Sequence, residues 1–160
     1  MSPILAIDPG PTTSGWVLYD NGIYPQVIEC GQEADLDTVF RILGRCLSER
    51  GVEVVAIERV QSYGISGASL LETSEVVGRL WQRALDVGFS VRLVRRLQVL
   101  SALNVTGKGN KDSLVRHRLM EIHGGSGSVG TKKAPGPLYG VSGHAWSALA
   151  VAWTASRMMS

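Results

Sequence analysis

The sequence has no long hydrophobic run and little cysteine. No apolar run approaches the roughly 18 residues that a transmembrane helix requires, so we expect no membrane contact. The first residues contain neither a basic region nor a long apolar stretch, which argues against a secretory leader. Cys30 and Cys46 are too few for a disulfide framework and form no CxxC zinc motif. A reducing, cytoplasmic location is therefore expected.

The composition indicates one folded domain spanning residues 1–160. The chain has 160 residues, enough to bury a sizeable core in one ordinary domain. Hydrophobic residues make up 44% and charged residues 19%, and this balance excludes disorder for most of the chain. We find no internal repeat.

Positive charge is concentrated in one segment. Residues 92–133 contain nine Lys and Arg against two acids, which is +7 and leaves −5 for the rest of a chain whose total is +2. A basic half beside an acidic half indicates a polyanion such as nucleic acid as partner. A basic but merely solvated helix face is the alternative.

Short apolar runs alternate with helical patterns along the chain. Strands are predicted at 3–7, 15–19, 23–30, 52–57 and 90–94. Helices are predicted at 36–50, 68–87, 96–103, 111–122 and 143–157, with Asp35 as an N-cap and Gly51 as a stop. Residues 124–143 contain seven glycines and are expected to form a mobile loop. This order predicts an α/β fold, a mixed five-stranded sheet with helices on both faces.

Two predicted strands each end in an acid. Asp8 follows the first strand and Glu58 follows the fourth, and these strands are expected to be neighbours in the sheet. Asp8 before Pro9 and Gly10 is by itself typical of an ordinary turn. Two acids at adjacent carboxyl ends favour a ligand site instead, because ligands bind at those ends in open sheets.

An imidazole could complete this site. His144 opens the last helix, where a lone histidine is often simply exposed, but beside two carboxylates it becomes a candidate metal ligand. Ser147 lies one turn further on the same helix and is a poor ligand. Asp8, Glu58 and His144 would suit Mg²⁺ or Mn²⁺, and two such ions commonly serve phosphodiester cleavage.

Three blocks of the sequence resemble the RuvC family of Holliday junction resolvases. They are Ile4-Leu5-Ala6-Ile7-Asp8-Pro9-Gly10 with Gly15, then Val55-Ala56-Ile57-Glu58-Arg59-Val60, then His144 followed by Ser147-Ala148-Leu149-Ala150-Val151-Ala152. The resemblance implies an RNase H-like fold, a homodimer and paired symmetric nicks in four-way junction DNA. It assigns Asp8, Glu58 and His144 as the catalytic, metal-binding set. The fourth position of that set, normally Asp, is Ser147 here.

The resemblance also implies residues that contact DNA. Lys111, after Lys108 in a glycine-rich turn, matches a basic family position, while a second family lysine is replaced by Leu100. Arg95 and Arg96 could replace its charge, and phosphate contacts of this kind set affinity rather than sequence preference. Tyr63 lies near an aromatic family position, where it could stack on an unpaired base or pack locally. Lys132 and Lys133 add charge in the glycine-rich segment.

Other functions remain open on the sequence. The Ser147 departure permits a DNA-binding protein that does not cleave. A single-domain nuclease acting on RNA is a further possibility, whereas an actin-like phosphotransferase would need two lobes that 160 residues without a repeat cannot supply. The helix at 68–87 has more apolar surface than one core needs, and Trp81 and Leu85 on it could form a dimer surface. A phage gene would place the protein in the host cytoplasm.

Overall fold

A mixed five-stranded sheet is the centre of the fold, in a computed structural model that describes residues 2–62, 64 and 67–160. The strands are β1 (Ile4–Asp8), β2 (Ser14–Asp20), β3 (Gln26–Glu33), β4 (Val54–Arg59) and β5 (Ser90–Arg95), in the order β3-β2-β1-β4-β5. β1 runs antiparallel to β2 and parallel to β4. The prediction that the first and fourth strands are neighbours is therefore confirmed.

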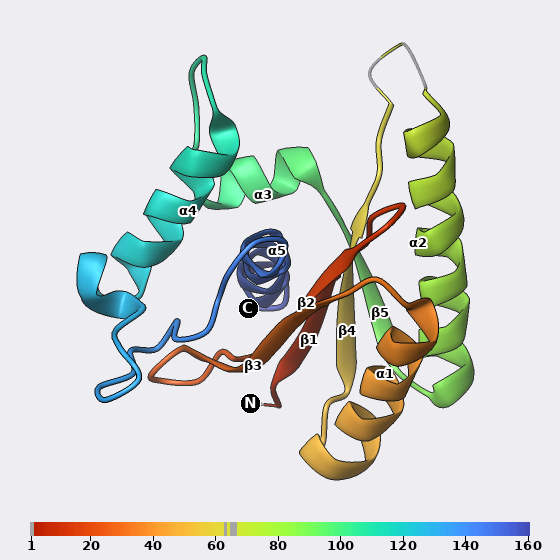
Figure 1. The fold of residues 1–160 in the computed structure, drawn as a ribbon, viewed down its shortest axis with the longest axis horizontal. Helices are drawn as coiled ribbons and strands as arrows, with labels where there is room; N and C mark the ends of the chain where they lie inside the picture. Colours follow the sequence, from red (N-terminus) through yellow and green to blue (C-terminus); the bar gives the residue numbers. More distant parts are fainter. Residues whose placement is uncertain (1, 63, 65–66) are drawn as a thin grey trace.

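Helices cover both faces of the sheet, as predicted. They are α1 (Leu36–Arg50), α2 (Ala68–Val87), α3 (Arg96–Ala102), α4 (Lys111–Ile122) and α5 (Ala145–Met158). α1 and α2 pack on one face of the sheet through one apolar cluster. α5 packs on the other face through a second cluster, and α3 and α4 pack against α5 and contribute to the same cluster (Figure 1). Since α5 has protein on nearly every side, it contains many small residues, among them five alanines, that allow close approach to the sheet.

The predicted helix boundaries have identifiable causes. The Asp35 side chain accepts a hydrogen bond from the Asp37 N–H, as an N-cap does, and Gly51 closes α1 in the left-handed conformation. Gly88 closes α2 in the same conformation, at φ 105°. The third strand starts at Gln26 rather than residue 23, because Pro25 has no N–H to give to a ladder. Within the described residues, no helix is both long and apolar enough to cross a membrane.

The prediction of an unstructured loop at 124–143 is wrong. This segment contains a 3₁₀ turn (Ser126–Ser128) and a bridge between Gly130 and Pro135, and Leu138 is fully buried. It is fixed to β3 by a hydrogen bond from the Val27 N–H to the Pro137 carbonyl. Two of its glycines serve tight backbone packing, since a Cβ at Gly130 would collide with the Gly136 backbone and a Cβ at Gly136 with the Ser128 carbonyl.

Candidate active site

Two carboxyl groups meet on the α5 face of the sheet. Ile7 of β1 is paired with Ile57 of β4, so Asp8 and Glu58 are the next residues in the same parallel register. Side chains alternate between faces along a strand, and the preceding pair, Ala6 and Ala56, belongs to the cluster under α5. Asp8 is directly hydrogen-bonded to Glu58.

This carboxyl pair favours proton uptake. Burial, the hydrogen bond with Asp8 and repulsion from its charge raise the pKa of Glu58 to about 9. Burial also raises the pKa of Asp8, against the opposing effects of its hydrogen bond with Glu58 and the nearby Arg96 charge. In the absence of a cation, the two groups therefore share a proton near neutral pH, as expected for two carboxyls in one small volume.

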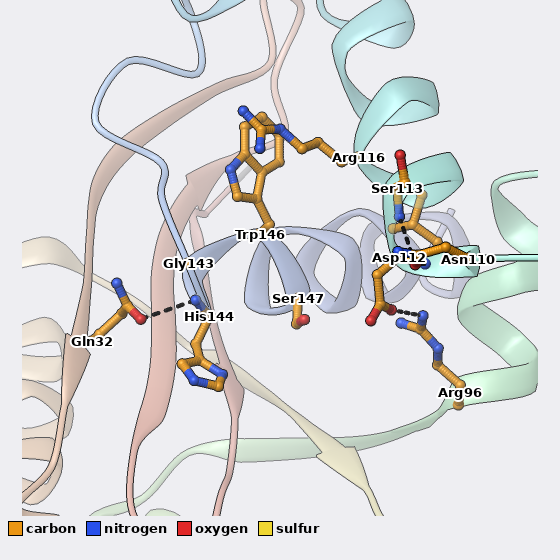
Figure 2. Close-up of a pocket in the computed structure, with 11 residues that line it drawn as sticks. Gln32, Arg96, Asn110, Asp112, Ser113, Arg116, Gly143, His144, Trp146 and Ser147 are labelled. Carbon is orange, nitrogen blue, oxygen red and sulfur yellow. Dashed lines mark hydrogen bonds and ion pairs between the residues drawn. The ribbon is translucent and has the colours of Figure 1, made fainter.

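A glycine allows the start of α5 to approach the carboxyl pair. Gly15 lies opposite Asp8 on β2, and a Cβ there would collide with the backbone carbonyl of His144. The His144 Nδ1 lies 3.9 Å from the Asp8 Oδ2. The next residue across the sheet, Gln32, accepts a hydrogen bond from the His144 N–H at 3.0 Å. Residues in one row of the sheet therefore position His144 at the start of α5, and Figure 2 shows the hydrogen bond from its N–H to Gln32.

Ser147 takes part in this arrangement as a hydrogen-bonding residue. It lies one turn into α5, is half-buried, and its hydroxyl is hydrogen-bonded to Asp8. The hydroxyl favours the ionised form of that carboxyl and so opposes the effect of burial. Asp8 consequently contacts Glu58 and Ser147 and faces His144, which makes it the central residue of the site.

Two cavities lie at the site, one lined by the carboxyl pair and one by His144 and Ser147. One, of about 300 Å³, is lined by Asp8, Glu58, Gln61, Thr73 and Arg96 among others. The second, of about 590 Å³, lies between α4 and the start of α5 and is lined by His144, Ser147, Asp112 and Arg96 among others. Arg96 lines both cavities and forms an ion pair with Asp112, the second residue of α4 (Figure 2).

The sequence alone did not reveal Gln32 and Asp112 as site residues. Gln32 is found only from the strand register, because nothing in its local sequence distinguishes it. Asp112 follows the N-cap Asn110, a place where an acid is ordinary because it complements the helix dipole. Its charge nevertheless raises the pKa of both Asp8 and Glu58, which places it in their electrostatic environment.

The predicted DNA-contacting residues fall into two groups. Lys111, at the start of α4, and Lys108, in the turn before it, are exposed next to the cavity-lining residues Asn110 and Asp112, and Arg95 is exposed at the end of β5 beside Arg96. Lys132 and Lys133 form the tip of the turn between Gly130 and Pro135, away in sequence from any residue that lines either cavity. Leu100 is buried in the core. Tyr63 lies outside the described residues.

The donor set fits divalent cations without forming a finished cage. Over the described part of the chain, no group of three His, Cys, Asp or Glu side chains is arranged to hold a metal ion. The hydrogen-bonded carboxyls, however, place two acidic oxygen donors together, and the nearby Arg96 charge favours their ionised form. A hard cation is the ligand such oxygens prefer, and it would replace the proton that the pair shares. Asp8 and Glu58 would hold it, with His144 beside them.

The sheet order and the helices on its two faces define an RNase H-like α/β fold. Solved structures similar to this chain include RuvC of Thermus thermophilus in complex with a Holliday junction substrate, with a TM-score of 0.71 and 19% identity over 99% of this chain and 96% of that one. Another Thermus thermophilus RuvC structure has a TM-score of 0.67 and 20% identity, covering 98% and 96% of the two chains. The yeast mitochondrial Holliday junction resolvase has a TM-score of 0.58 and 12% identity, covering 99% and 81%. At these identities the likeness establishes the fold. No family model and no curated protein matches the sequence.

The raised pKa of Glu58 predicts a pH-dependent stability. The folded protein binds a proton that the unfolded chain releases above pH 4.5, so the free energy of unfolding falls as pH rises from about 4.5 to about 9. Glu58→Gln removes this loss. In EDTA at pH 8.5 we expect a melting temperature about 5 °C or more above that of the parent, with little difference at pH 4.5.

Thermal unfolding across this pH range measures the effect, with Glu53→Gln as the matched control because Glu53 is exposed just before the same strand. Equal melting temperatures for parent and Glu58→Gln at both pH values would show that ionisation of Glu58 does not destabilise the folded protein.

Proposed function

We propose that this protein is a metal-dependent, structure-specific DNA endonuclease that resolves four-way junctions by paired symmetric nicks. The observation that carries the proposal is the hydrogen-bonded Asp8–Glu58 pair, in register on adjacent parallel strands and facing His144. The similar solved structures support it, because one is a Holliday junction resolvase by name and another, RuvC, is in complex with a Holliday junction substrate. The products would be two nicked duplexes.

The chain's own residues have distinct parts in this proposal. Asp8 and Glu58 bind the cations, and Ser147 orients the Asp8 carboxyl through its hydroxyl. Two bound Mg²⁺ or Mn²⁺ ions would activate water and neutralise the leaving oxygen. His144, exposed at 56% of its side chain, can bind an ion or transfer a proton at the entrance of the site.

The DNA partner is inferred from charge and position. Lys108 and Lys111 lie on the turn and helix start that border the larger cavity, and Arg116 faces the same cavity over the ring of Trp146 at 4.7 Å. Cations beside a carboxyl pair can hold the phosphates that flank a scissile bond. Arg95 extends this basic surface at the end of β5, whereas Lys132 and Lys133 would contact a more distant part of a junction.

The proposal includes a homodimer, supported by the symmetry of the substrate and by the exposed apolar face of α2. Leu71, Trp81 and Leu85 are 61%, 41% and 48% exposed, although α2 packs on the sheet with its other side. Ser74 and Gly78 lie between them at alternating spacings of three and four residues, so the five form one stripe. A Cβ at Gly78 would have no atom of the described residues within 4 Å outside the backbone of its own helix, so this position leaves room for a partner helix. Two such chains would present two sites to two equivalent strands.

Substrate choice tests the proposed function. Purified protein is incubated with a synthetic four-way DNA junction, the matching linear duplex, and a structured RNA of the same size, each with Mg²⁺, Mn²⁺ or EDTA. We expect metal-dependent nicks at symmetric positions in two opposing junction strands, at least about 100-fold faster than in the linear duplex. Equal cutting of the duplex, or preference for the RNA, would contradict the proposal.

Ser147 favours a second candidate, a junction-binding protein with impaired cleavage. A hydroxyl replaces the acid that the family resemblance places at this position, so the site has one charge fewer for its cations. Tight junction binding without nicks in either metal would support this candidate. Restoration of nicking by Ser147→Asp would then identify the missing charge as the cause.

A further inference from the structure

Asp112 lines the cavity beside Ser147 and His144, on an element that the sequence motifs do not include. It lies at the second position of α4, and its carboxylate lines the same cavity as Ser147 and His144. Figure 2 shows its side chain on the side of Ser147 away from His144, extended from α4 toward the cavity. The carboxylate is 79% exposed, so the fold does not require it as a buried contact.

Arg96 connects Asp112 with the pair. Its guanidinium forms an ion pair with Asp112, and the side chain lines both the cavity of Asp112 and the cavity of Asp8 and Glu58. The charges of Arg96 and Asp112 act in opposite senses on the pKa of both carboxyls, since Arg96 lowers it and Asp112 raises it. One guanidinium therefore pairs with Asp112 and also acts electrostatically on Asp8 and Glu58.

Ser147 and Asp112 have complementary positions. Ser147 lies on the α5 side of the cavity with a hydroxyl that cannot balance a cation's charge, whereas Asp112 faces the same space from α4 with a full negative charge. The affinity of a site for a hard cation depends on the number of its carboxylates. A carboxylate missing from the α5 wall of the cavity can therefore be replaced by one on the α4 wall. The ion pair supplies a partner for Asp112 while no cation is present.

We propose that Asp112 supplies the fourth acidic group of the ion site, in place of the acid absent at Ser147, and that Arg96 is its exchangeable partner in the ion-free protein. This inference rests on the proposed function for its chemistry, since it concerns the cations of that reaction. It assigns Asp112 to ion binding and Arg96 to a positioning part.

The test measures Mn²⁺ binding to the full-length protein by titration calorimetry without DNA, together with nicking of the four-way junction at limiting Mn²⁺. The variants are Asp112→Asn, Ser147→Asp and the double variant. Glu121→Gln is the matched control, because Glu121 is an ion-paired acid at the other end of the same helix. We expect Asp112→Asn to weaken Mn²⁺ binding about tenfold, and Ser147→Asp to restore it in the double variant.

Three results would overturn the inference. The first is Mn²⁺ affinity in Asp112→Asn equal to that of the parent. The second is tighter junction binding by Asp112→Asn at unchanged Mn²⁺ affinity, which would mean that Asp112 only competes with phosphate for Arg96. The third is a parent that binds Mn²⁺ no better than Asp8→Asn does.

The two proposals fail in different ways. If the parent and Asp112→Asn nick the junction equally fast and bind Mn²⁺ equally tightly, the proposed function stands and Asp112 has no part in the ion site. If the parent cuts no junction but Asp112→Asn binds Mn²⁺ more weakly than the parent does, Asp112 is an ion ligand and the four-way junction is not the substrate.

Discussion

Asp8→Asn is expected to lower the rate of junction nicking by at least about 10³-fold, which corresponds to about 4 kcal/mol of transition-state stabilisation. Asp8 is hydrogen-bonded to Glu58 and Ser147 and lies 3.9 Å from His144, so its charge is central to any cation site here. The amide has nearly the same shape and keeps the fold, but it carries no charge for a cation.

Junction affinity separates this effect from misfolding. In EDTA, a gel shift with the four-way junction should give dissociation constants for parent and Asp8→Asn within about threefold, because phosphate contacts come from cations outside the pair. Asp20→Asn is the control: Asp20 also ends a strand, but its carboxylate only accepts the Gly22 N–H of the following turn. Equal nicking by parent and Asp8→Asn would remove Asp8 from the site.

The carboxyl pair was predictable because it depends on two local patterns and one rule of topology. Each acid ends an apolar run, and a meander followed by a crossover brings the first and fourth strands together. The hydrogen bond between Asp8 and Glu58 also requires the strands to be in register, and register follows from the full set of sheet contacts rather than from either run.

The rest of the site depends on contacts between distant segments. Gly15 looks like an ordinary turn residue in the sequence, yet its missing Cβ makes room for the His144 carbonyl. Gln32 reaches the His144 N–H across 112 residues of chain. Asp112 has a sufficient local explanation as an acid at a helix start, and this conceals its approach to the cavity.

Composition gave a correct result for α2 and a wrong one for 124–143. In α2 the helical period and Gly88 agree, so the predicted and observed limits coincide at 68 and 87. In 124–143 the many glycines suggested a mobile chain, although Leu138 and Val141 are apolar anchors that are buried in the core. Such anchors outweigh glycine content when a neighbouring sheet edge offers backbone partners, as Val27 does.

Leu85→Glu is expected to dissociate the proposed dimer and to uncouple the two nicks. Leu85 is 48% exposed on the α2 stripe, and in a two-fold interface each substitution occurs twice. Loss of a central apolar anchor commonly costs about 2 kcal/mol of binding free energy. The two substitutions in a dimer should therefore cost about 4 kcal/mol and weaken dimerisation by about 10³-fold. Sedimentation equilibrium measures the mass, and Ile23→Glu is the matched control because Ile23 is 90% exposed far from α2.

A supercoiled plasmid with an extruded cruciform reports the coupling of the nicks directly. A dimer that cuts both strands during one binding event produces linear plasmid, whereas independent monomers first accumulate nicked circles. We expect linear product from the parent and from Ile23→Glu, and nicked circles from Leu85→Glu, while the rate of the first nick at saturating protein changes little because Leu85 lines neither cavity at the carboxyl pair. Linear product from a Leu85→Glu protein that sediments as a monomer would show that paired cleavage does not require this surface, and a parent that is itself monomeric would remove α2 as an interface.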